Sequence, residues 1–543
     1  MTPRSSTPLS VPPFRDLYNL SIPELWLSAL LRLSVVGTSS QYESVPLVYE
    51  IDEKVKAVVM KSSGLSTATQ QCRSNLDNRD KWVEALKTAF SEVGIDVKNI
   101  ELLADAVEEE LMTQTEAANR KRKVKAAIPI TPISGILQNQ AGVVGSDKYV
   151  DFGKAVEEIY EIGRILSRDG KSDSASASER LLSALISRRA NDKRLAAVDN
   201  ALKTSLASAL EKSFNEIEVF YSEVEGKLTF GEKHEIDRHE FNSDEDDILE
   251  NLKFIDDMNC YVWFYKSWNK LTSPEWVNAT PHRRWTDWLV TITRLGVGTS
   301  FLFRANWVIE AVKVALNQNV NVSEVQDRML AALETPILDW VDRSQSLSGQ
   351  RDVNPQLRKL LCTSKAIEQE LKKADFVSAI GDDESIEKLK SVLESSQSLT
   401  KQLEYALSNL GRDDKGPLDL RSKSIKPVHN TIRDSLVDRT SDGNESESSD
   451  YYALMRSESI GNRTLTYFDP LSEVVALIAS LACDSPTSMT TLGDVRRQFQ
   501  KLGFQPSQNE LRFLLERAGL CRAEADASLQ VVVSSALKLE ELL

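Results

Sequence analysis

Apolar residues recur every three or four positions along most of this chain, which is the spacing of one face of an α-helix. The longest such run lies between residues 191 and 225, where neither proline nor glycine interrupts the pattern. It predicts one helix of roughly 30 residues, about 45 Å long at about 1.5 Å per residue. The apolar positions of this run are Leu195, Val198, Leu202, Leu206, Leu210, Phe214 and Ile217. The pattern therefore predicts a mainly α protein with long helices.

The N-terminal region carries a helix start signal. In "SIPELWLSALLRLSVV", Ser21 is followed by Pro23 and Glu24, which is typical of the first turn of a capped helix. Further helices are predicted across "NRDKWVEALKTAFSEV" and "VKNIELLADAVEEELMTQTEAANRKRKVK". The next stretch, "AAIPITPISGILQNQAGVVG", holds two prolines and three glycines. It cannot continue a helix, so it marks a boundary or a strand-and-loop insert.

Aromatic residues concentrate between Cys260 and Trp307, a segment that holds six of the nine tryptophans. These six are Trp263, Trp268, Trp276, Trp285, Trp288 and Trp307. Side chains of this size dominate protein cores, so we expect most of them to be buried. The end of the segment predicts a pair of buried helices, in which Gly296 and Gly298 permit a bend or a close helix contact.

Residues 355–410 form another helical region. Its heptad frame contains Ile386, Leu389, Leu393, Leu403, Leu407 and Leu410, with Ser396 and Thr400 as weak core positions. This pattern predicts a short coiled coil or helical hairpin. Residues 411–466 then lose the apolar period and include the acidic, serine-rich "RTSDGNESESSD". Such a composition is typical of a flexible linker.

The C-terminal region resembles a winged helix in the order and size of its predicted elements. Helices are predicted in "DPLSEVVALIASLACDSPTS", "TLGDVRRQFQKLGF" and "SQNELRFLLERAGL", and a strand in "ASLQVVVSSAL". Ser507 and Glu510 have the spacing of a capping box at the start of the third helix. Its inward positions would be Leu511, Leu514, Leu515 and Ala518, and its outward positions Gln508, Asn509, Arg512 and Glu516.

An outward helix of this kind can contact DNA or another protein. Arginine, asparagine and glutamine suit base edges and phosphates. Residues 485–533, however, hold six basic and five acidic side chains, and a net charge near +1 supplies few phosphate contacts. Protein docking is therefore the preferred interpretation and DNA contact the alternative. The candidate contact residues here are Arg496, Arg497, Lys501, Gln508, Asn509, Arg512 and Arg517.

Two further basic groups are candidates for nucleic-acid or partner contact. The densest cluster contains Arg120, Lys121, Arg122 and Lys123; a solvated helix end, where the dipole favours positive charge, is the preferred interpretation. Arg283 and Arg284 lie in "TPHRRWTDW", and arginine beside tryptophan can stack on bases or form a protein hot spot. The same pattern also suits a helix start packed into a core, with Thr280 as the cap and Pro281 next, and this is preferred.

Composition narrows the class of protein. The net charge of −15 and a pI near 5.1 argue against a surface that grips nucleic acid throughout. Five scattered cysteines form no disulfide framework or C-x-x-C pair, and no signal peptide or membrane span of about 20 apolar residues is evident. We therefore expect a cytoplasmic protein without a membrane segment. The spacing of His234 and His239 does not match a zinc-hydrolase helix, and no motif predicts a metal, cofactor or small-molecule substrate.

The chain is predicted to be a multi-domain helical protein. The expected parts are an N-terminal helical domain (14–126), a Pro/Gly-rich insert (127–150), a central helical domain with a tryptophan-rich core (151–350), a coiled-coil-like hairpin (351–410), a flexible linker (411–466) and a winged-helix-like domain (467–543).

No phosphate-binding loop, nucleophile elbow or framed carboxylate pair occurs, so an enzyme has no positive support. The leading hypothesis is a non-enzymatic scaffold or adaptor subunit whose partners are other proteins. Accessory subunits of prokaryotic DNA-handling and genome-defence complexes have a similar make-up, which suggests such an assembly by association. The alternatives are a DNA-binding protein that uses the C-terminal domain, and a hydrolase or nuclease without a recognised motif.

Overall fold

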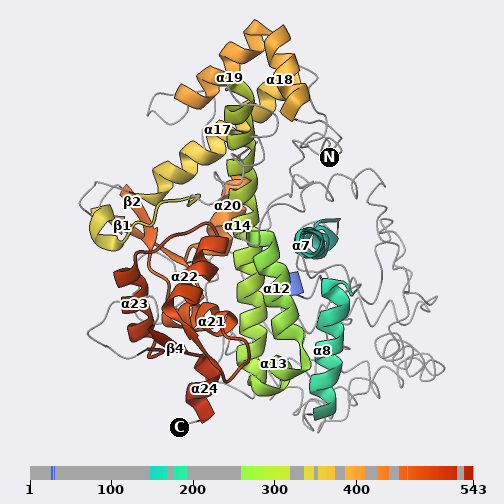
Figure 1. The fold of residues 1–543 in the computed structure, drawn as a ribbon, viewed down its shortest axis with the longest axis vertical. Coiled ribbons are helices and arrows are strands. Elements are labelled where there is room, and N and C mark those ends of the chain that lie inside the picture. The colour runs from blue at the N-terminus through green and yellow to red at the C-terminus, as the bar shows by residue number, and fades with distance from the viewer. Residues whose placement is uncertain are drawn as a thin grey trace, which may run out of the picture.

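The computed structural model describes part of the chain (Figure 1). The described residues are Trp26, Leu27, Leu30 and the ranges 147–167, 175–191, 259–317, 336–347, 352–373, 386–409, 425–438, 452–460, 463–521 and 531–541. Most of them are helical, which confirms the mainly α prediction. The expected N-terminal helices, the cluster at residues 120–123 and the helix expected after residue 191 lie outside the described residues.

A long helix, α14, forms the axis of the molecule, and Figure 1 shows α12 beside it, with α7 and α8 on one side and the C-terminal elements on the other. Helix α7 begins at Asp147 and includes the last four residues of the segment predicted as an irregular insert, so that prediction is wrong for residues 147–150. The helices of this part are α7 (Asp147–Leu166), α8 (Ala177–Asn191), α12 (Cys260–Thr272), α13 (Pro274–Ala279) and α14 (His282–Leu316).

Helix α14 is one continuous helix of 35 residues, so the prediction of a helix pair is wrong. Its two glycines allow close helix contacts. A Cβ at Gly296 would lie 2.5 Å from the ring of Phe264 on α12, and one at Gly298 would lie 2.7 Å from Leu436. Both separations are shorter than atomic contact allows, so these neighbours can approach this closely only because the two positions are glycine. The close-contact alternative is therefore confirmed.

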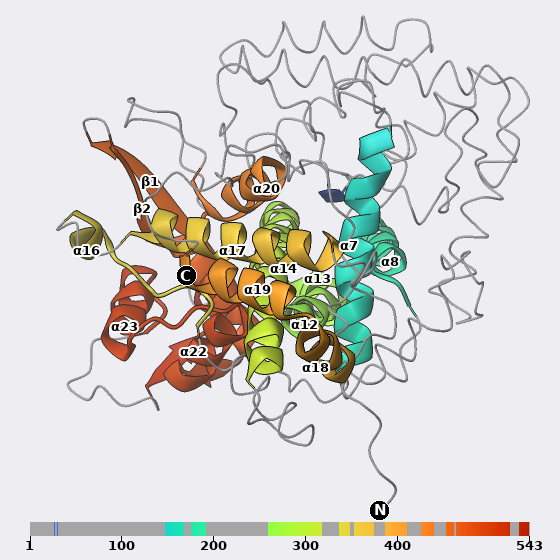
Figure 2. The same ribbon diagram turned by 90° about the horizontal axis from the view of Figure 1, so that it is seen from above.

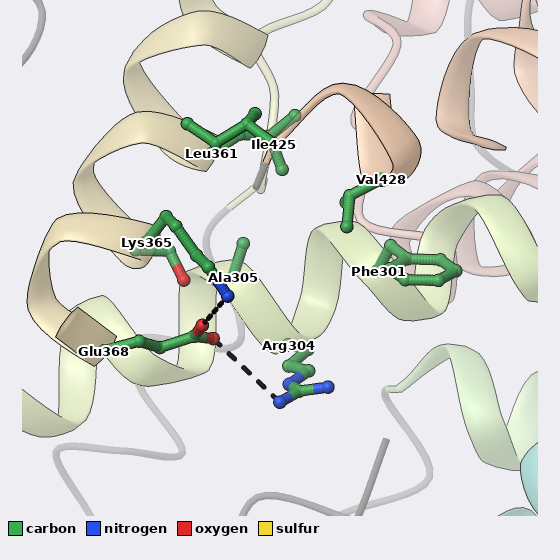
Figure 3. A pocket seen from close by; sticks show the side chains of 9 residues that line it. Phe301, Arg304, Ala305, Leu361, Lys365, Glu368, Ile425 and Val428 are labelled. Carbon is green, nitrogen blue, oxygen red and sulfur yellow. Dashed lines mark hydrogen bonds and ion pairs between the residues drawn. The ribbon is translucent and has the colours of Figure 1, made fainter. Parts of the chain in front are cut away.

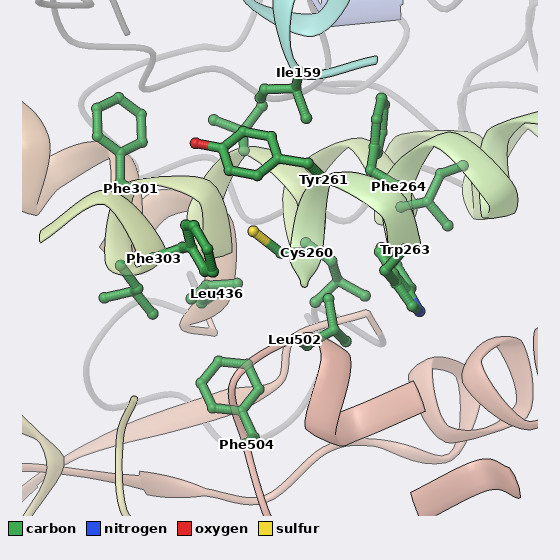
Figure 4. Packing of buried hydrophobic residues seen from close by; sticks show 14 of the residues in the cluster. Ile159, Cys260, Tyr261, Trp263, Phe264, Phe301, Phe303, Leu436, Leu502 and Phe504 are labelled. Atoms are coloured by element: carbon green, nitrogen blue, oxygen red, sulfur yellow. The ribbon is translucent and has the colours of Figure 1, made fainter. Parts of the chain in front are cut away.

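The tryptophan-rich core is confirmed, because all six tryptophans between residues 263 and 307 are at most 3 % exposed. Figure 4 shows Tyr261 of α12 beside Phe303 of α14, and their ring centroids are 5.6 Å apart. Two indole groups also tie helices together through hydrogen bonds to backbone carbonyls. Trp268 Nε1 donates to Ala177 O at 3.1 Å, and Trp285 Nε1 donates to Leu271 O at 2.7 Å.

The start of α14 differs from the expectation by one position. Thr280 is the C-cap of α13, and Pro281 is the N-cap of α14, so the prediction that Thr280 caps α14 is wrong. The backbone N–H of Thr280 donates to Trp276 O at 3.1 Å, which closes the short helix α13. The interruption before α14 is therefore the end of the short helix α13, and not a threonine cap of α14.

The region predicted as a coiled-coil-like hairpin forms a layer against α14. Its elements are α17 (Val353–Lys373), α18 (Ile386–Ser395) and α19 (Gln397–Asn409), and the short helix α16 (Arg343–Leu347) precedes it. Helix α17 packs on α14 and α19 packs on α17, and Figure 2 shows α17 and α19 side by side. The heptad positions Leu389, Leu393 and Leu403 are buried as expected. Ser396 separates two helices, and Thr400 Oγ1 donates to Leu393 O at 2.9 Å across that break.

The linker prediction for residues 411–466 is wrong wherever the structure describes that segment. Helix α20 (Lys426–Leu436) packs on α14, and strands β1 (Met455–Ile460) and β2 (Arg463–Phe468) form an antiparallel hairpin. Ile425, Ile432 and Leu436 are at most 2 % exposed. These residues are seven and four positions apart and form a narrow apolar stripe. The residues around them are mostly polar, so the composition of the segment resembles that of a linker.

The outer edge of β2 is covered by the segment that leads into α17. Asn354 Nδ2 donates to Thr464 O at 3.2 Å, and the N–H of Thr466 donates to Asp352 Oδ1 at 3.1 Å. Further along, the N–H of Phe468 donates to Val341 O at 2.8 Å. These contacts satisfy the backbone groups of an edge strand and join the hairpin to the central helices.

The C-terminal elements follow in the order helix, strand, helix, helix, strand, helix. They are α21 (Ser472–Ala482), β3 (Met489–Thr491), α22 (Leu492–Lys501), α23 (Gln508–Arg517), β4 (Val532–Ser534) and α24 (Ala536–Glu541). Strands β3 and β4 pair antiparallel, with Thr491 opposite Val532 and Met489 opposite Ser534. The buried apolar residues of this unit belong to the same continuous cluster as those of α12 and α14.

Several specific contacts attach this unit to the central helices. Lys270 Nζ on α12 donates to Leu481 O at 2.9 Å and to Cys483 O at 2.6 Å. The ring of Trp340 stacks on that of Phe468, with the centroids 4.5 Å apart. The C-terminal unit is therefore attached to the central helices by direct contacts as well as by the chain that precedes it. No helix among the described residues is long and apolar enough to cross a membrane.

Candidate partner-docking surface

Helix α23 is oriented by its first turn and its apolar face. Ser507 Oγ accepts from the N–H of Glu510 at 3.3 Å, and Glu510 Oε2 accepts from the N–H of Ser507 at 2.8 Å. This reciprocal pair confirms the predicted capping box. Leu511, Leu514 and Leu515 are buried, as the sequence indicated. The opposite side of the helix must therefore face solvent.

The outward side of α23 carries three exposed side chains at four-residue spacing, namely Asn509, Phe513 and Arg517, and we call these the α23 face. Side chains four positions apart lie on the same face of a helix. Phe513 is 61 % exposed, and the Arg517 guanidinium lies 5.9 Å from the centre of its ring. Gln508 and Arg512, which were predicted to face outward, are only partly exposed.

Three of the arginines of α22 and α23 lie beside acceptors from this chain. Arg512 Nε lies 2.8 Å from Glu516 Oε1, and Arg497 Nη1 lies 3.3 Å from Asp494 Oδ1. Arg517 reaches outside its own helix, where Nη1 lies 3.0 Å from Asp469 Oδ1 and Nη2 donates to the Pro470 carbonyl. The charge available to an external anion on this surface is therefore small.

The two other basic candidates of this unit, Arg496 and Lys501, are partly buried. The Nε of Arg496 is shielded from solvent and has no hydrogen-bond partner among the described residues. Close by, a hydrogen bond from the Thr491 hydroxyl, at 2.6 Å, holds the pKa of Asp494 below its usual range, with a smaller contribution from Arg497. Asp494 therefore stays ionised at neutral pH and offsets the charge of Arg497, with which it pairs.

A second group of exposed apolar side chains lies on the β3–β4 ribbon. Met489 is 53 % and Val532 55 % exposed, whereas Val533 is fully buried. The strand register places Met489 and Val532 on one face of the ribbon and Val533 on the other, because side chains alternate along a strand. Sequence reasoning missed this face. The run of three valines at 531–533 indicated a strand but not which of its positions is exposed.

The remaining predicted contact residues do not join the α23 face. Arg120, Lys121, Arg122 and Lys123 lie outside the described residues, and so does the side chain of Arg283. Arg284 lies near a partly buried contact in which the Tyr452 hydroxyl donates to Asp287 Oδ2 at 3.1 Å. Burial and the Asp287 carboxylate raise the pKa of Tyr452, and Arg284 opposes them. Arg284 therefore belongs to the junction between α14 and residue 452.

The described residues contain no group of three or more His, Cys, Asp or Glu side chains that could hold a metal ion. Burial raises the pKa of the Cys260 thiol to about 12 and that of Cys483 to about 11, which keeps both thiols protonated and unreactive. The sequence matches no protein-family model, no curated protein and no solved structure.

Proposed function

We propose that this chain is a non-enzymatic adaptor subunit that binds another protein through the α23 face. The observation that carries the proposal is the 61 % exposure of Phe513 at the centre of that face. Aromatic side chains are enriched at the centres of protein interfaces, where a few of them contribute most of the binding energy. Exposed phenylalanine costs hydration free energy in the free protein, so a contact that covers it is favourable.

The order of the C-terminal elements supports a winged-helix-like arrangement as part of this proposal. Helix α21, strand β3, helices α22 and α23, and strand β4 follow one another as in that architecture, with β3 and β4 paired. In it α23 occupies the position of the recognition helix. The architecture binds both DNA and protein partners, so the side chains of α23 determine which kind of partner is bound.

Charge favours a protein partner. Binding to DNA releases counterions in proportion to the number of phosphates that cationic side chains neutralise. Arg497, Arg512 and Arg517 lie 2.8–3.3 Å from carboxylates of this chain, and a phosphate would have to compete with those partners. A protein partner that covers the Phe513 side chain does not have to compete with these ion pairs.

DNA binding remains the second candidate, because one observation favours it. Gln508 and Asn509 lie in the first turn of α23, and recognition helices use this end to reach base edges. We further propose a reducing, cytoplasmic location, since Cys260, Cys362 and Cys483 are free thiols and disulfides are rare in that compartment.

The test is affinity purification of the full chain and of two variants, with and without nuclease treatment. Phe513→Asp should abolish capture of the partner protein. Tyr405→Asp is the matched control, because Tyr405 is an aromatic residue with 64 % exposure on a different helix, α19, and it should leave capture unchanged. A partner that is retained by Phe513→Asp, or lost after nuclease treatment, would contradict docking through this face.

A further inference from the structure

One carboxylate contacts two arginines where the β1–β2 hairpin meets α23. Arg517 Nη1 on α23 donates to Asp469 Oδ1 at 3.0 Å, and Arg456 Nε on β1 lies 3.2 Å from Asp469 Oδ2. Figures 1 and 2 both show the hairpin and α23 on the same side of the molecule. Asp469 carries a single negative charge, so these three side chains, which we call the Asp469 cluster, keep one positive charge in excess.

The Arg456 guanidinium is the part of the Asp469 cluster that can bind a further anion. Its Nε is shielded from solvent, but the whole side chain is 39 % exposed. The guanidinium makes no hydrogen bond to a described residue, whereas Arg517 donates from both terminal nitrogens, to Asp469 and to the Pro470 carbonyl. Two parallel N–H donors of an arginine match the two oxygens of a carboxylate. The terminal nitrogens of Arg456 can therefore bind a carboxylate while the contact between Asp469 and Arg517 stays intact.

The neighbouring arginine of the hairpin surface is balanced. Arg343 Nε and Nη2 each donate to one oxygen of Glu458 at 2.9 Å, and the Tyr467 hydroxyl donates to the same carboxylate at 3.3 Å. Glu458 lies two residues after Arg456 on β1, so both side chains are on one face of the strand. The pair of Arg343 and Glu458 adds no net charge, and the excess charge therefore belongs to the Asp469 cluster.

A buried group of similar composition has no space for a ligand. Lys365 Nζ lies 2.9 Å from Glu368 Oε2, and Arg304 Nη2 lies 4.0 Å from Glu368 Oε1, as Figure 3 shows. The hollow beside them has a volume of about 50 Å³, which holds no more than a few water molecules. Arg304 also has further interactions within the chain. The Asp469 cluster differs from this group because it lies at the surface, where a partner molecule can reach it.

The exposed ring of Phe513 lies next to the Asp469 cluster. Arg517 belongs to both features, since its guanidinium carbon lies 5.9 Å from the centre of the Phe513 ring. The surface therefore places an apolar ring beside one unbalanced positive charge. A phosphate backbone offers no apolar group to cover such a ring. An extended polypeptide, at about 3.3 Å per residue, can present an acidic and an apolar side chain a short distance apart.

We propose that the partner bound by the α23 face presents one acidic side chain, Asp or Glu, close to an apolar side chain. The acidic carboxylate pairs with the terminal nitrogens of Arg456, and the apolar side chain packs on Phe513. A single carboxylate balances the excess charge of the Asp469 cluster, whereas a phosphorylated side chain, with a charge of about −2, exceeds it. The inference rests on the proposed function, because it names the chemistry of the partner for that same face.

Peptide selection on the full chain tests this chemistry without a known partner. A phage library of random peptides should yield binders in which Asp or Glu lies within a few positions of an aromatic or aliphatic residue. Replacing that acidic residue by its amide in a synthetic peptide should weaken binding about tenfold, because the charge-assisted pair with Arg456 is lost. Binders without an acidic residue, or a library that yields no binder, would overturn the proposal.

Four variants locate the contact. Arg456→Gln should weaken the acidic peptide about tenfold and leave its amide form unchanged. Arg497→Gln is the matched control, because Arg497 is an exposed arginine of the C-terminal unit that pairs with Asp494, outside the cluster; it should leave peptide binding unchanged. Asp469→Asn removes the shared carboxylate and should strengthen binding by up to about fivefold, a gain that misfolding cannot produce. Phe513→Asp should abolish binding.

The outcomes separate this inference from the proposed function. Loss of peptide binding in Phe513→Asp, together with unchanged binding in Arg456→Gln, would keep the docking face and overturn the acidic partner. Peptide binding that survives Phe513→Asp would overturn docking through the α23 face itself. Displacement of the peptide by duplex DNA at low salt would assign Arg456 to phosphate and overturn the protein partner.

Discussion

Lys270 on α12 joins the central helices to the C-terminal unit, and its removal tests whether the two form one folded body. Its ammonium group donates to the carbonyl oxygens of Leu481 and Cys483 at 2.9 and 2.6 Å. These carbonyls are at the end of α21, where helix groups lack an intrahelical partner and a cation is favoured by the dipole. Burial lowers the pKa of Lys270, which shows that the buried charge also carries a desolvation cost.

Lys270→Met keeps the length of the side chain and removes its charge and donors. Hydrogen bonds from a charged group contribute about 1.5–3 kcal/mol each, and a buried carbonyl that loses its donor costs about 1–3 kcal/mol. The desolvation cost that disappears with the charge offsets part of this loss. We therefore expect the free energy of unfolding of the C-terminal unit to fall by about 2–4 kcal/mol.

Native-state hydrogen exchange measures this effect in α21. A loss of 2 kcal/mol corresponds to exchange about 30-fold faster for amides that open with the unit. Lys313→Met is the control, because Lys313 is 52 % exposed on α14 and pairs with Glu310 of the same helix; it should change stability by less than about 0.5 kcal/mol. Equal exchange in both variants would refute the argument that Lys270 attaches the two parts.

Three further outcomes are expected. Trp288→Ala should lower the free energy of unfolding by about 3–5 kcal/mol in urea titrations, because Trp288 is fully buried; unchanged stability would contradict its core role. Burial raises the pKa of Glu157 from 4.5 to about 7, so its contribution to stability is complete below pH 4.5 and is lost between pH 4.5 and 7, by at most about 3 kcal/mol. Glu157→Gln should remove this slope from stability curves measured against pH, and an unaltered slope would exclude Glu157 as its source. The double change Arg512→Ala and Arg517→Ala should leave any binding to duplex DNA within about twofold in a salt titration, whereas a fall in the salt slope of about one unit per arginine would indicate DNA recognition.

Local patterns in the sequence determined several parts of this fold. The capping box of Ser507 and Glu510 and the buried Leu511 of α23 depend on positions only three or four residues apart, so the sequence predicts them directly. The burial of Trp288 and its neighbours follows from the size and apolar character of indole side chains. The burial of Leu389, Leu393 and Leu403 likewise follows from their heptad spacing.

Only the tertiary structure determined where these elements lie and which groups their charged side chains contact. The polar segment around α20 becomes buried because α14 offers a complementary face, including the space beside Gly298 that Leu436 fills. Arg517 pairs with Asp469, 48 positions away, and Lys270 binds a helix end more than 200 positions away. An interpretation based on periods of two to seven residues cannot foresee such pairs, because the free energy of each depends on a partner that the fold brings near.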